Sequence, residues 1–314
     1  MSNSSNQAVA KNGSENIEPE EVSIPVPWGH ISGKWWGSRS IQPIITLHGR
    51  QDNSGSFDPL MKLLISNNKN HSYLCLDLPG HGYSSHLREG QYYFMHWDCL
   101  ILLRRIIKYY QWNKIKILGH SLGGAIGFLY AATYPDEIDL LISLDIASPS
   151  VKKIPNLVTS TGNQIDKYLK YEKLTLDNVP CYEYDEMLGI VLDAYNGNIT
   201  RKSAEILMIR GMQPASLPGK YYFSRDPRLK VSMLGFLTAD LSKQYAEQIK
   251  CPYLNIRALQ GLKNEISGHY EEILDIIKKK SSKFEYQEVE GTHHVHLNDP
   301  EKVAPLIENF LNSI

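Results

Sequence analysis

The sequence predicts an α/β fold, with a mostly parallel sheet covered by helices on both faces and an inserted helical segment. Short apolar runs alternate with helical segments along most of the chain, and the connections between them are short. Such alternation is typical of right-handed βαβ units, which place parallel strands between two layers of helices. The alternation stops over about residues 146–230 and then resumes. A chain of 314 residues with 42% hydrophobic content is long enough to bury one large core with an inserted subdomain.

The expected elements follow in chain order. Three strand-like runs are followed by helix, strand, helix, strand, helix and strand, at 21–26, 31–36, 41–47, 57–65, 72–77, 92–110, 115–118, 121–134 and 138–145. After the interruption the order is helix, strand, helix, strand and helix, at 241–249, 252–256, 270–279, 284–289 and 300–311. Apolar residues dominate the strand runs, as expected of strands that are covered on both faces.

The same pattern predicts the domain boundaries. We expect residues 1–17, which are polar and rich in serine and asparagine, to form a disordered tail. Residues 18–145 and 236–314 then form the core that contains the sheet, and residues 146–235 form a helical cap. A cap above the strand ends can act as a lid and a substrate wall. Its tyrosines either line an apolar pocket or simply pack the cap: Tyr168, Tyr171, Tyr182, Tyr184, Tyr221 and Tyr222.

Bulk properties exclude several classes of function. The net charge of −1 and the lack of a dense basic run argue against nucleic acid as a partner. No apolar stretch approaches the ~18 residues that span a bilayer, and no secretory signal is visible. The four cysteines are scattered without C-x-x-C spacing, which predicts reduced thiols in an intracellular, cytoplasmic protein without a zinc site. The C-terminus carries no peroxisomal Ser-Lys-Leu signal.

The segment Gly119–Gly123 has the pattern G-x-S-x-G and is the strongest chemical signal in the chain. An apolar strand-like run precedes it and a helical segment follows, which is the context in which this motif is meaningful. A serine on such a sharp turn exposes its hydroxyl above the sheet, and the helix directs its positive end towards that hydroxyl. We therefore predict Ser121 as a nucleophile, with the Leu122 N–H as one donor to an oxyanion.

A base for Ser121 is expected on the segment 291–301, between the last strand and the last helix. This loop lies at the same edge of the predicted sheet as Ser121, and it carries three candidates, His293, His294 and His296. The residue pattern does not choose among them, because neighbouring side chains in an extended loop point in different directions.

The acid that orients the base is predicted at the end of a strand. Asp145 ends the apolar strand that follows the motif, and it is favoured over Glu265, which lies well beyond the strand 252–256. The other strand end offers only Gln260. Asp145 has an alternative role as an N-cap of the first cap helix.

A second oxyanion donor is expected in Leu47–Gln51, the glycine-containing loop after the third strand. We predict the backbone N–H of Arg50 as this donor, since glycine lets the backbone approach the serine. His48 is predicted to brace the loop.

These motifs occur in an order that resembles the α/β-hydrolase superfamily over about residues 20–314: His48–Gly49, Asp77–Ser84, Gly119–Gly123 and the His293 loop. The resemblance implies a mostly parallel eight-stranded sheet with helices on both faces and a helical cap. Within the superfamily, the chain is most similar to the serine hydrolase-like, or kraken-type, proteins. The segments His48–Phe57 and Tyr222–Lys230 carry that similarity.

The resemblance also implies roles for individual residues. The superfamily pattern G-x-H-x-x-H-x-x-x-P-E makes the first histidine catalytic, which selects His293 and places His296 second. Many relatives carry an aspartate where this chain has Ala258–Gly261, but some place the acid one strand after the nucleophile, and Asp145 fits that plan.

The implied function is that of a serine hydrolase. We expect it to cleave a small, hydrophobic carboxylic ester through an acyl-enzyme, without a metal or another cofactor. Two alternatives remain on the same scaffold: a carbon–carbon or amide hydrolase that uses the same triad, and a non-catalytic protein that binds a small ligand. A small-molecule substrate is the only partner that the sequence predicts, and it gives no oligomeric state.

Overall fold

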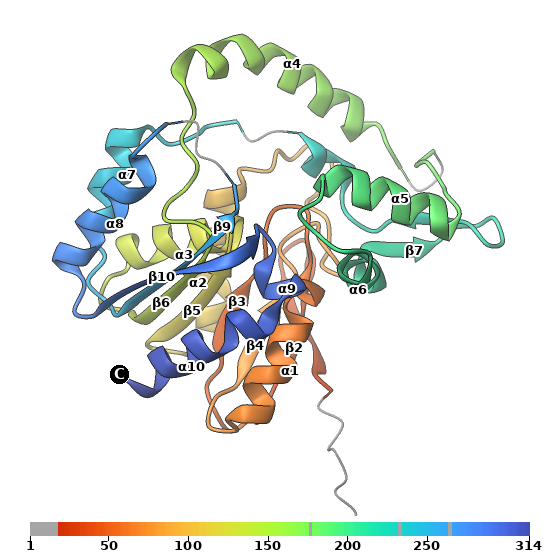
Figure 1. Ribbon diagram of the computed structural model, residues 1–314. Helices are drawn as coiled ribbons and strands as arrows, with labels where there is room; N and C mark the ends of the chain where they lie inside the picture. The colour runs from red at the N-terminus through yellow and green to blue at the C-terminus, as the bar shows by residue number, and fades with distance from the viewer. Residues whose placement is uncertain (1–17, 176–177, 232–233, 263–265) are drawn as a thin grey trace, which may run out of the picture.

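The computed structural model describes residues 18–175, 178–231, 234–262 and 266–314 (Figure 1). The expected tail, residues 1–17, and the alternative acid, Glu265, lie outside these residues. Within the described ranges, none of the helices has both the length and the apolar character needed to cross a bilayer.

A single eight-stranded sheet forms the centre of the molecule, in the order β1-β2-β4-β3-β5-β6-β9-β10. Strand β2 runs antiparallel to its neighbours β1 and β4, and every other pair of neighbours is parallel. The strands are β1 (Glu20–Val26), β2 (Gly29–Trp36), β3 (Ile44–Leu47), β4 (Tyr73–Leu76), β5 (Ile115–His120), β6 (Ile138–Leu144), β9 (Tyr253–Gln260) and β10 (Phe284–Thr292). This confirms the predicted fold class.

Helices cover both faces of the sheet (Figure 1). One face carries α1 (Asp58–Asn67) and α10 (Ala304–Asn312), and the other carries α2 (Met95–Tyr109), α3 (Leu122–Thr133), α7 (Ala239–Ala246) and α8 (His269–Lys280). Two apolar clusters fill the spaces between the sheet and these layers. The central strands β3 and β4 are buried along their whole length, which explains why they have no polar face.

Several element ends differ from the predicted ones for local reasons. Strand β3 begins at Ile44 rather than at residue 41, because Pro43 has no N–H to donate to a neighbouring strand. Helix α7 begins at Ala239 rather than at residue 241, because the Thr238 side chain caps it by accepting a bond of 3.1 Å from the Leu241 N–H.

Between β6 and α7 the chain leaves the sheet and forms α4 (Ile154–Glu172), α5 (Tyr184–Tyr195), α6 (Arg201–Gly211), β7 (Met212–Pro214), β8 (Tyr221–Phe223) and the 3₁₀ helix η2 (Pro227–Lys230). Figure 1 shows α4 arching over the molecule and α5 and α6 lying to one side of the sheet. The hairpin β7–β8 was not predicted, since two strands of three residues leave no readable alternation.

A buried apolar cluster and a buried ion pair are among the contacts that fasten this segment to the rest of the molecule. Buried apolar side chains of α5 and α6 form a cluster that includes Leu297 from the short helix α9 (Val295–Asn298). The Arg210 side chain, 1% exposed, donates to Asp77 Oδ2 from Nη2 at 2.7 Å and from Nε at 3.0 Å. It also donates to Glu21 on β1. The ion pair fixes α6 against the loop that follows β4.

Candidate active site

Ser121 occupies the turn between β5 and α3 in a backbone conformation that residues other than glycine rarely adopt, with φ 50° and ψ −115°. The glycines on either side explain how so tight a turn packs. A Cβ atom on Gly119 would lie 2.4 Å from the backbone of Gly123, and one on Gly123 would lie 2.0 Å from the carbonyl oxygen of Leu47. Only glycine fits at both positions, so the motif is a packing requirement of this turn.

His293 follows β10 and lies against Asp145, which follows β6. The two side chains are buried, and Nδ1 of His293 is 2.5 Å from Oδ2 of Asp145. Because a carboxylate accepts hydrogen bonds, Nδ1 carries the proton and Nε2 of the ring keeps its lone pair. An imidazole held in this tautomer can accept a proton at Nε2.

The end of β9 supplies the pocket for the Asp145 carboxylate. The Ala258 N–H donates to Oδ1 at 2.9 Å and the Leu262 N–H donates to Oδ2 at 3.3 Å. A Cβ atom on Gly261 would lie 2.2 Å from Oδ2, so this position also requires glycine. In the sequence, this strand end shows only the absence of an acid. Gly261 was the one sequence feature that could have indicated that an acid from another element packs against this strand end.

Gln260 has a bracing role at the same strand end. Its Nε2 donates to Glu290 at 2.8 Å, and its Oε1 accepts from the Gly291 N–H at 2.7 Å. These bonds hold the residues that lead into His293.

Ser121 and His293 line one cavity of about 430 Å³, together with Arg50 and Leu122. Asp145 is not among the lining residues, and it lies behind the His293 ring. The inserted segment contributes Tyr195 and Asn198 to the wall, so the cavity lies where this segment meets the sheet.

The aromatic side chains that line this cavity differ from the tyrosines named as candidates. Tyr195 and Phe236 line it, whereas none of the six tyrosines named from the sequence does so. Tyr168 is instead buried and donates to the Gln91 carbonyl oxygen at 2.7 Å, and Tyr182 pairs with Tyr221 through backbone hydrogen bonds. Of the two roles left open for these tyrosines, lining the pocket does not apply to this cavity, and the contacts of these three are packing contacts of the insertion.

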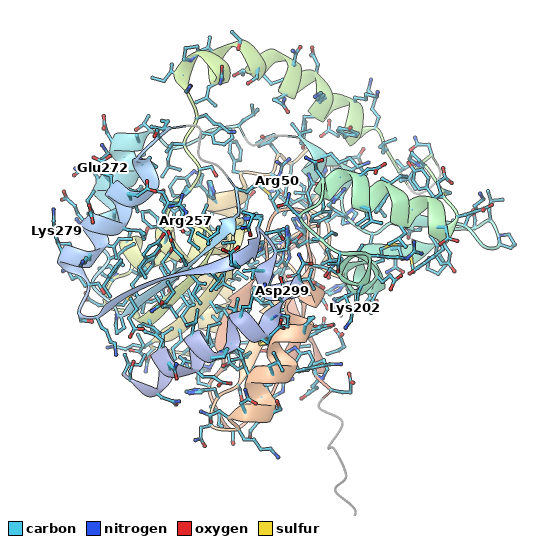
Figure 2. The ribbon with its side chains drawn as sticks, in the orientation of Figure 1. Arg50, Lys202, Arg257, Glu272, Lys279 and Asp299 are labelled. Atoms are coloured by element: carbon cyan, nitrogen blue, oxygen red, sulfur yellow. The ribbon has the colours of Figure 1, made fainter. Side chains whose placement is uncertain are left out.

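Arg50 and Leu122, the residues expected to supply the oxyanion donors, both line the cavity. Leu122 is the first residue of α3, so its N–H has no acceptor within the helix and points out of the positive helix end. Arg50, which is labelled in Figure 2, follows Gly49 in the loop after β3. Its guanidinium donates to the Val231 carbonyl oxygen at 2.8 Å and to that of Leu229 at 3.3 Å. The inserted segment therefore holds this loop in place.

His48 braces the same loop, as predicted. Its Nδ1 donates to the Gly49 carbonyl oxygen at 2.7 Å, and its Nε2 accepts from the Leu78 N–H at 3.0 Å. Burial lowers the pKa of His48, which keeps this ring neutral.

The other two histidines of the predicted loop do not contact Asp145. His294 lies against Asp52, with Nε2 at 3.2 Å from Oδ2, and His296 is completely buried. His120, the residue before Ser121, donates from Nε2 to the His293 carbonyl oxygen at 2.9 Å, and burial lowers its pKa to about 3. Burial acts to raise the pKa of Asp52, but the neighbouring His294 and His120 hold it well below its usual range.

Comparison with known proteins identifies the family. Residues 42–178 match a family described as having the alpha/beta hydrolase fold. A probable serine hydrolase from Drosophila melanogaster is 49% identical over 292 residues, which cover 93% of this chain and 87% of that protein. The chain belongs to the serine hydrolase-like family of α/β-hydrolases.

Two further family-level similarities extend over nearly the whole chain. Serine hydrolase-like protein 2 from Homo sapiens is 30% identical over 311 residues, covering 95% of this chain and 96% of the relative. A hypothetical protein of known crystal structure from Pseudomonas aeruginosa superposes with a TM-score of 0.80 at 28% identity, over 93% of this chain and 99% of that protein. The resemblance found in the sequence is thereby confirmed.

Proposed function

We propose that the protein is a serine hydrolase that cleaves a small, hydrophobic carboxylic ester through an acyl-enzyme. In this proposal Ser121 is the nucleophile, His293 is the general base and acid, and Asp145 orients the imidazole. The Arg50 and Leu122 N–H groups stabilise the oxyanion, and residues 146–235 form the cap over the site.

One observation supports this proposal most strongly. His293 bonds to the buried Asp145 at 2.5 Å, and the same histidine lines one cavity with Ser121. His296 has no hydrogen-bond partner on either ring nitrogen among the described residues, and His294 bonds to a different carboxylate, Asp52, at the longer distance of 3.2 Å. Of the three histidines in this loop, His293 is the one that bonds to the predicted acid, Asp145. A strained serine turn beside a histidine that a carboxylate orients is the combination that acyl transfer needs.

The steps follow from the residues. His293 Nε2 accepts the Ser121 proton as the hydroxyl oxygen attacks the ester carbonyl carbon, and two backbone N–H groups receive the resulting oxyanion. The intermediate collapses as His293 gives its proton to the leaving alkoxide. A water molecule then repeats the sequence on the acyl-enzyme, which releases the carboxylic acid and restores Ser121.

The cavity supports a small substrate. Its volume of about 430 Å³ lies near the lower end of the range for ligand pockets, ~300–1,000 Å³. Leu122, Ala125, Ile146 and Phe236 provide apolar wall beside the serine, which suits an acyl chain. The names of the relatives support hydrolysis that uses a serine nucleophile. The preference for esters is our inference from the apolar wall of the cavity.

The test is a series of p-nitrophenyl esters of increasing acyl length, assayed with the wild type and with Ser121→Ala. We expect turnover of short and medium esters by the wild type, with loss of at least 10³-fold in the variant. The same preparations are assayed on amides and on vinylogous diketones. Faster cleavage of either would replace the ester assignment, and binding of esters without turnover of any substrate would support a non-catalytic role.

A further inference from the structure

We propose that Asp52, His120 and His294 form a binding site for a divalent transition-metal ion such as Zn²⁺, which opens into the cavity beside Ser121. Each residue offers one ligand atom, and these atoms lie within 4.8 Å of one another. The site is separate from the contact between His293 and Asp145, so the proposal does not depend on the catalytic assignment.

The spacing of the ligand atoms suits a metal ion. Asp52 Oδ2 lies 3.6 Å from His120 Nδ1 and 3.2 Å from His294 Nε2. Ligands at ~2.1 Å from a tetrahedral Zn²⁺ are about 3.4 Å apart, so the observed distances need only small adjustments. When the ion binds, the proton on His294 Nε2 moves to Nδ1, which has no hydrogen-bond partner among the described residues. Two imidazoles and a carboxylate are a ligand set that Zn²⁺ and its neighbours accept. The cavity leaves room for a water as the fourth ligand.

The orientation of His120 supplies an independent argument. Its Nε2 donates to a carbonyl oxygen, so in the neutral ring Nδ1 holds a lone pair. That nitrogen has no hydrogen-bond partner among the described residues, and the residue is 1% exposed. Nδ1 lies 3.6 Å from Oδ2 of Asp52, an oxygen that also carries lone pairs and negative charge. Two such atoms facing each other in a buried place repel, and a cation between them would remove the repulsion.

Gly49 leaves the space that an ion would need. A Cβ atom at this position would lie 2.7 Å from Asp52 Oδ2 and 2.8 Å from His120 Nδ1. A side chain here would therefore fill the gap between the two ligand atoms.

The outer contacts also match those of metal sites. Histidine ligands usually donate their other N–H to a backbone carbonyl or a carboxylate, as His120 does to the His293 carbonyl oxygen. Ligating carboxylates are usually hydrogen-bonded in turn, and the Tyr195 hydroxyl donates to Asp52 Oδ1 at 2.5 Å. Both contacts hold the ligand atoms towards one point.

An ion can reach the site, because all three residues line the cavity that contains Ser121. The ligands come from the loop after β3, the end of β5 and the loop after β10. Their distance along the chain explains why no metal-binding spacing was visible in the sequence, which had predicted no metal site.

The test is isothermal titration of Zn²⁺ into full-length protein that has been treated with a chelator and dialysed. We expect one Zn²⁺ per chain, and Co²⁺ in its place should give the visible absorption of a tetrahedral site. His294→Ala and Asp52→Asn should abolish this binding. Tyr195→Phe, which keeps all three ligands, should weaken it by about 10- to 100-fold. His96→Ala removes a histidine from the same cavity but outside the site, and should bind as the wild type does.

Zn²⁺ binding that is absent in the wild type, or equal in wild type and His294→Ala, would overturn the proposal. Circular dichroism of each variant checks that it is folded, and Tyr195→Phe gives a second measure if Asp52→Asn does not fold. Ser121→Ala should still bind Zn²⁺ with wild-type affinity, so failure of the proposed hydrolase function and failure of the metal site are distinguishable.

Discussion

Replacing Asp145 by asparagine is a sharp test of the proposed site, because the change is isosteric and the structure dictates its consequence. The carboxylate accepts three hydrogen bonds, from the His293 ring at 2.5 Å, from the Ala258 N–H at 2.9 Å and from the Leu262 N–H at 3.3 Å. An amide has one accepting oxygen and one donating nitrogen, so it cannot satisfy all three.

Each orientation of the amide has a cost. With its oxygen towards Ala258, the amide nitrogen faces Nδ1 of His293 and forces the proton onto Nε2, which can then no longer accept one from Ser121. With its oxygen towards His293, the amide nitrogen meets the Ala258 N–H, donor against donor. The first orientation keeps the shorter backbone bond, from Ala258 at 2.9 Å, and loses only the longer one, from Leu262 at 3.3 Å, so we expect it to prevail. An imidazole in the wrong tautomer lowers turnover by about 10⁴-fold, or about 5 kcal/mol in the barrier.

The assay compares kcat/KM for the best p-nitrophenyl ester between the wild type, Asp145→Asn and Asp275→Asn. Asp275 is an exposed aspartate on α8, so the same substitution there should leave activity and stability unchanged. A thermal unfolding scan establishes that Asp145→Asn is folded. Activity above one tenth of wild type in the folded Asp145→Asn variant would refute the reasoning and move the orienting acid elsewhere.

Three further predictions concern packing and charge. Arg210→Met should lower the free energy of unfolding, measured in urea, by about 3–5 kcal/mol, because it leaves the buried Asp77 without its cation. The control, Arg201→Met on the exposed side of α6, should lower it by under about 0.5 kcal/mol, and equal effects would contradict the anchoring role of Arg210. Gly123→Ala should greatly reduce the yield of folded protein, since the added Cβ would lie 2.0 Å from Leu47. In the control Gly189→Ala on α5, the added Cβ meets no atom within 4 Å, so the free energy of unfolding should be unchanged or raised. A stable, folded Gly123→Ala variant would contradict the described turn. Burial lowers the pKa of His96 to about 4, so the folded state resists the protonation that the unfolded chain undergoes near pH 6.5, and this contribution to stability is full above that pH and lost as pH falls towards 4. Between pH 7.5 and 5 the free energy of unfolding of the wild type should therefore fall by about 2 kcal/mol more than that of His96→Leu. That difference would be absent if the ring were solvated.

The sequence could predict the fold because each of its signals is local. Alternation of apolar runs and helical segments identifies the strands, and the turn at Ser121 identifies which end of the sheet carries chemistry. The glycines around Ser121 were readable for the same reason, since they belong to one five-residue motif, although one of the clashes that they avoid is with Leu47 on the adjacent strand.

The parts that could not be predicted depend on contacts between distant segments. The backbone donors Ala258 and Leu262 belong to a strand end that, in the sequence, showed only a missing acid. The cavity wall uses Tyr195 and Phe236 rather than the tyrosines that stood out by number, because the fold of the insertion decides which rings face inward. The grouping of Asp52 with His120 and His294 likewise exists only after two loops and the end of β5 meet.

The most direct test of the central claim is to identify the residue that reacts with a fluorophosphonate serine probe in the full-length protein. The proposal predicts one phosphonate per chain, located by peptide mass spectrometry on Ser121, and reaction slowed by at least 100-fold in His293→Ala. Labelling of another residue, or labelling of Ser121 at the same rate without His293, would contradict the claim that this histidine activates this hydroxyl.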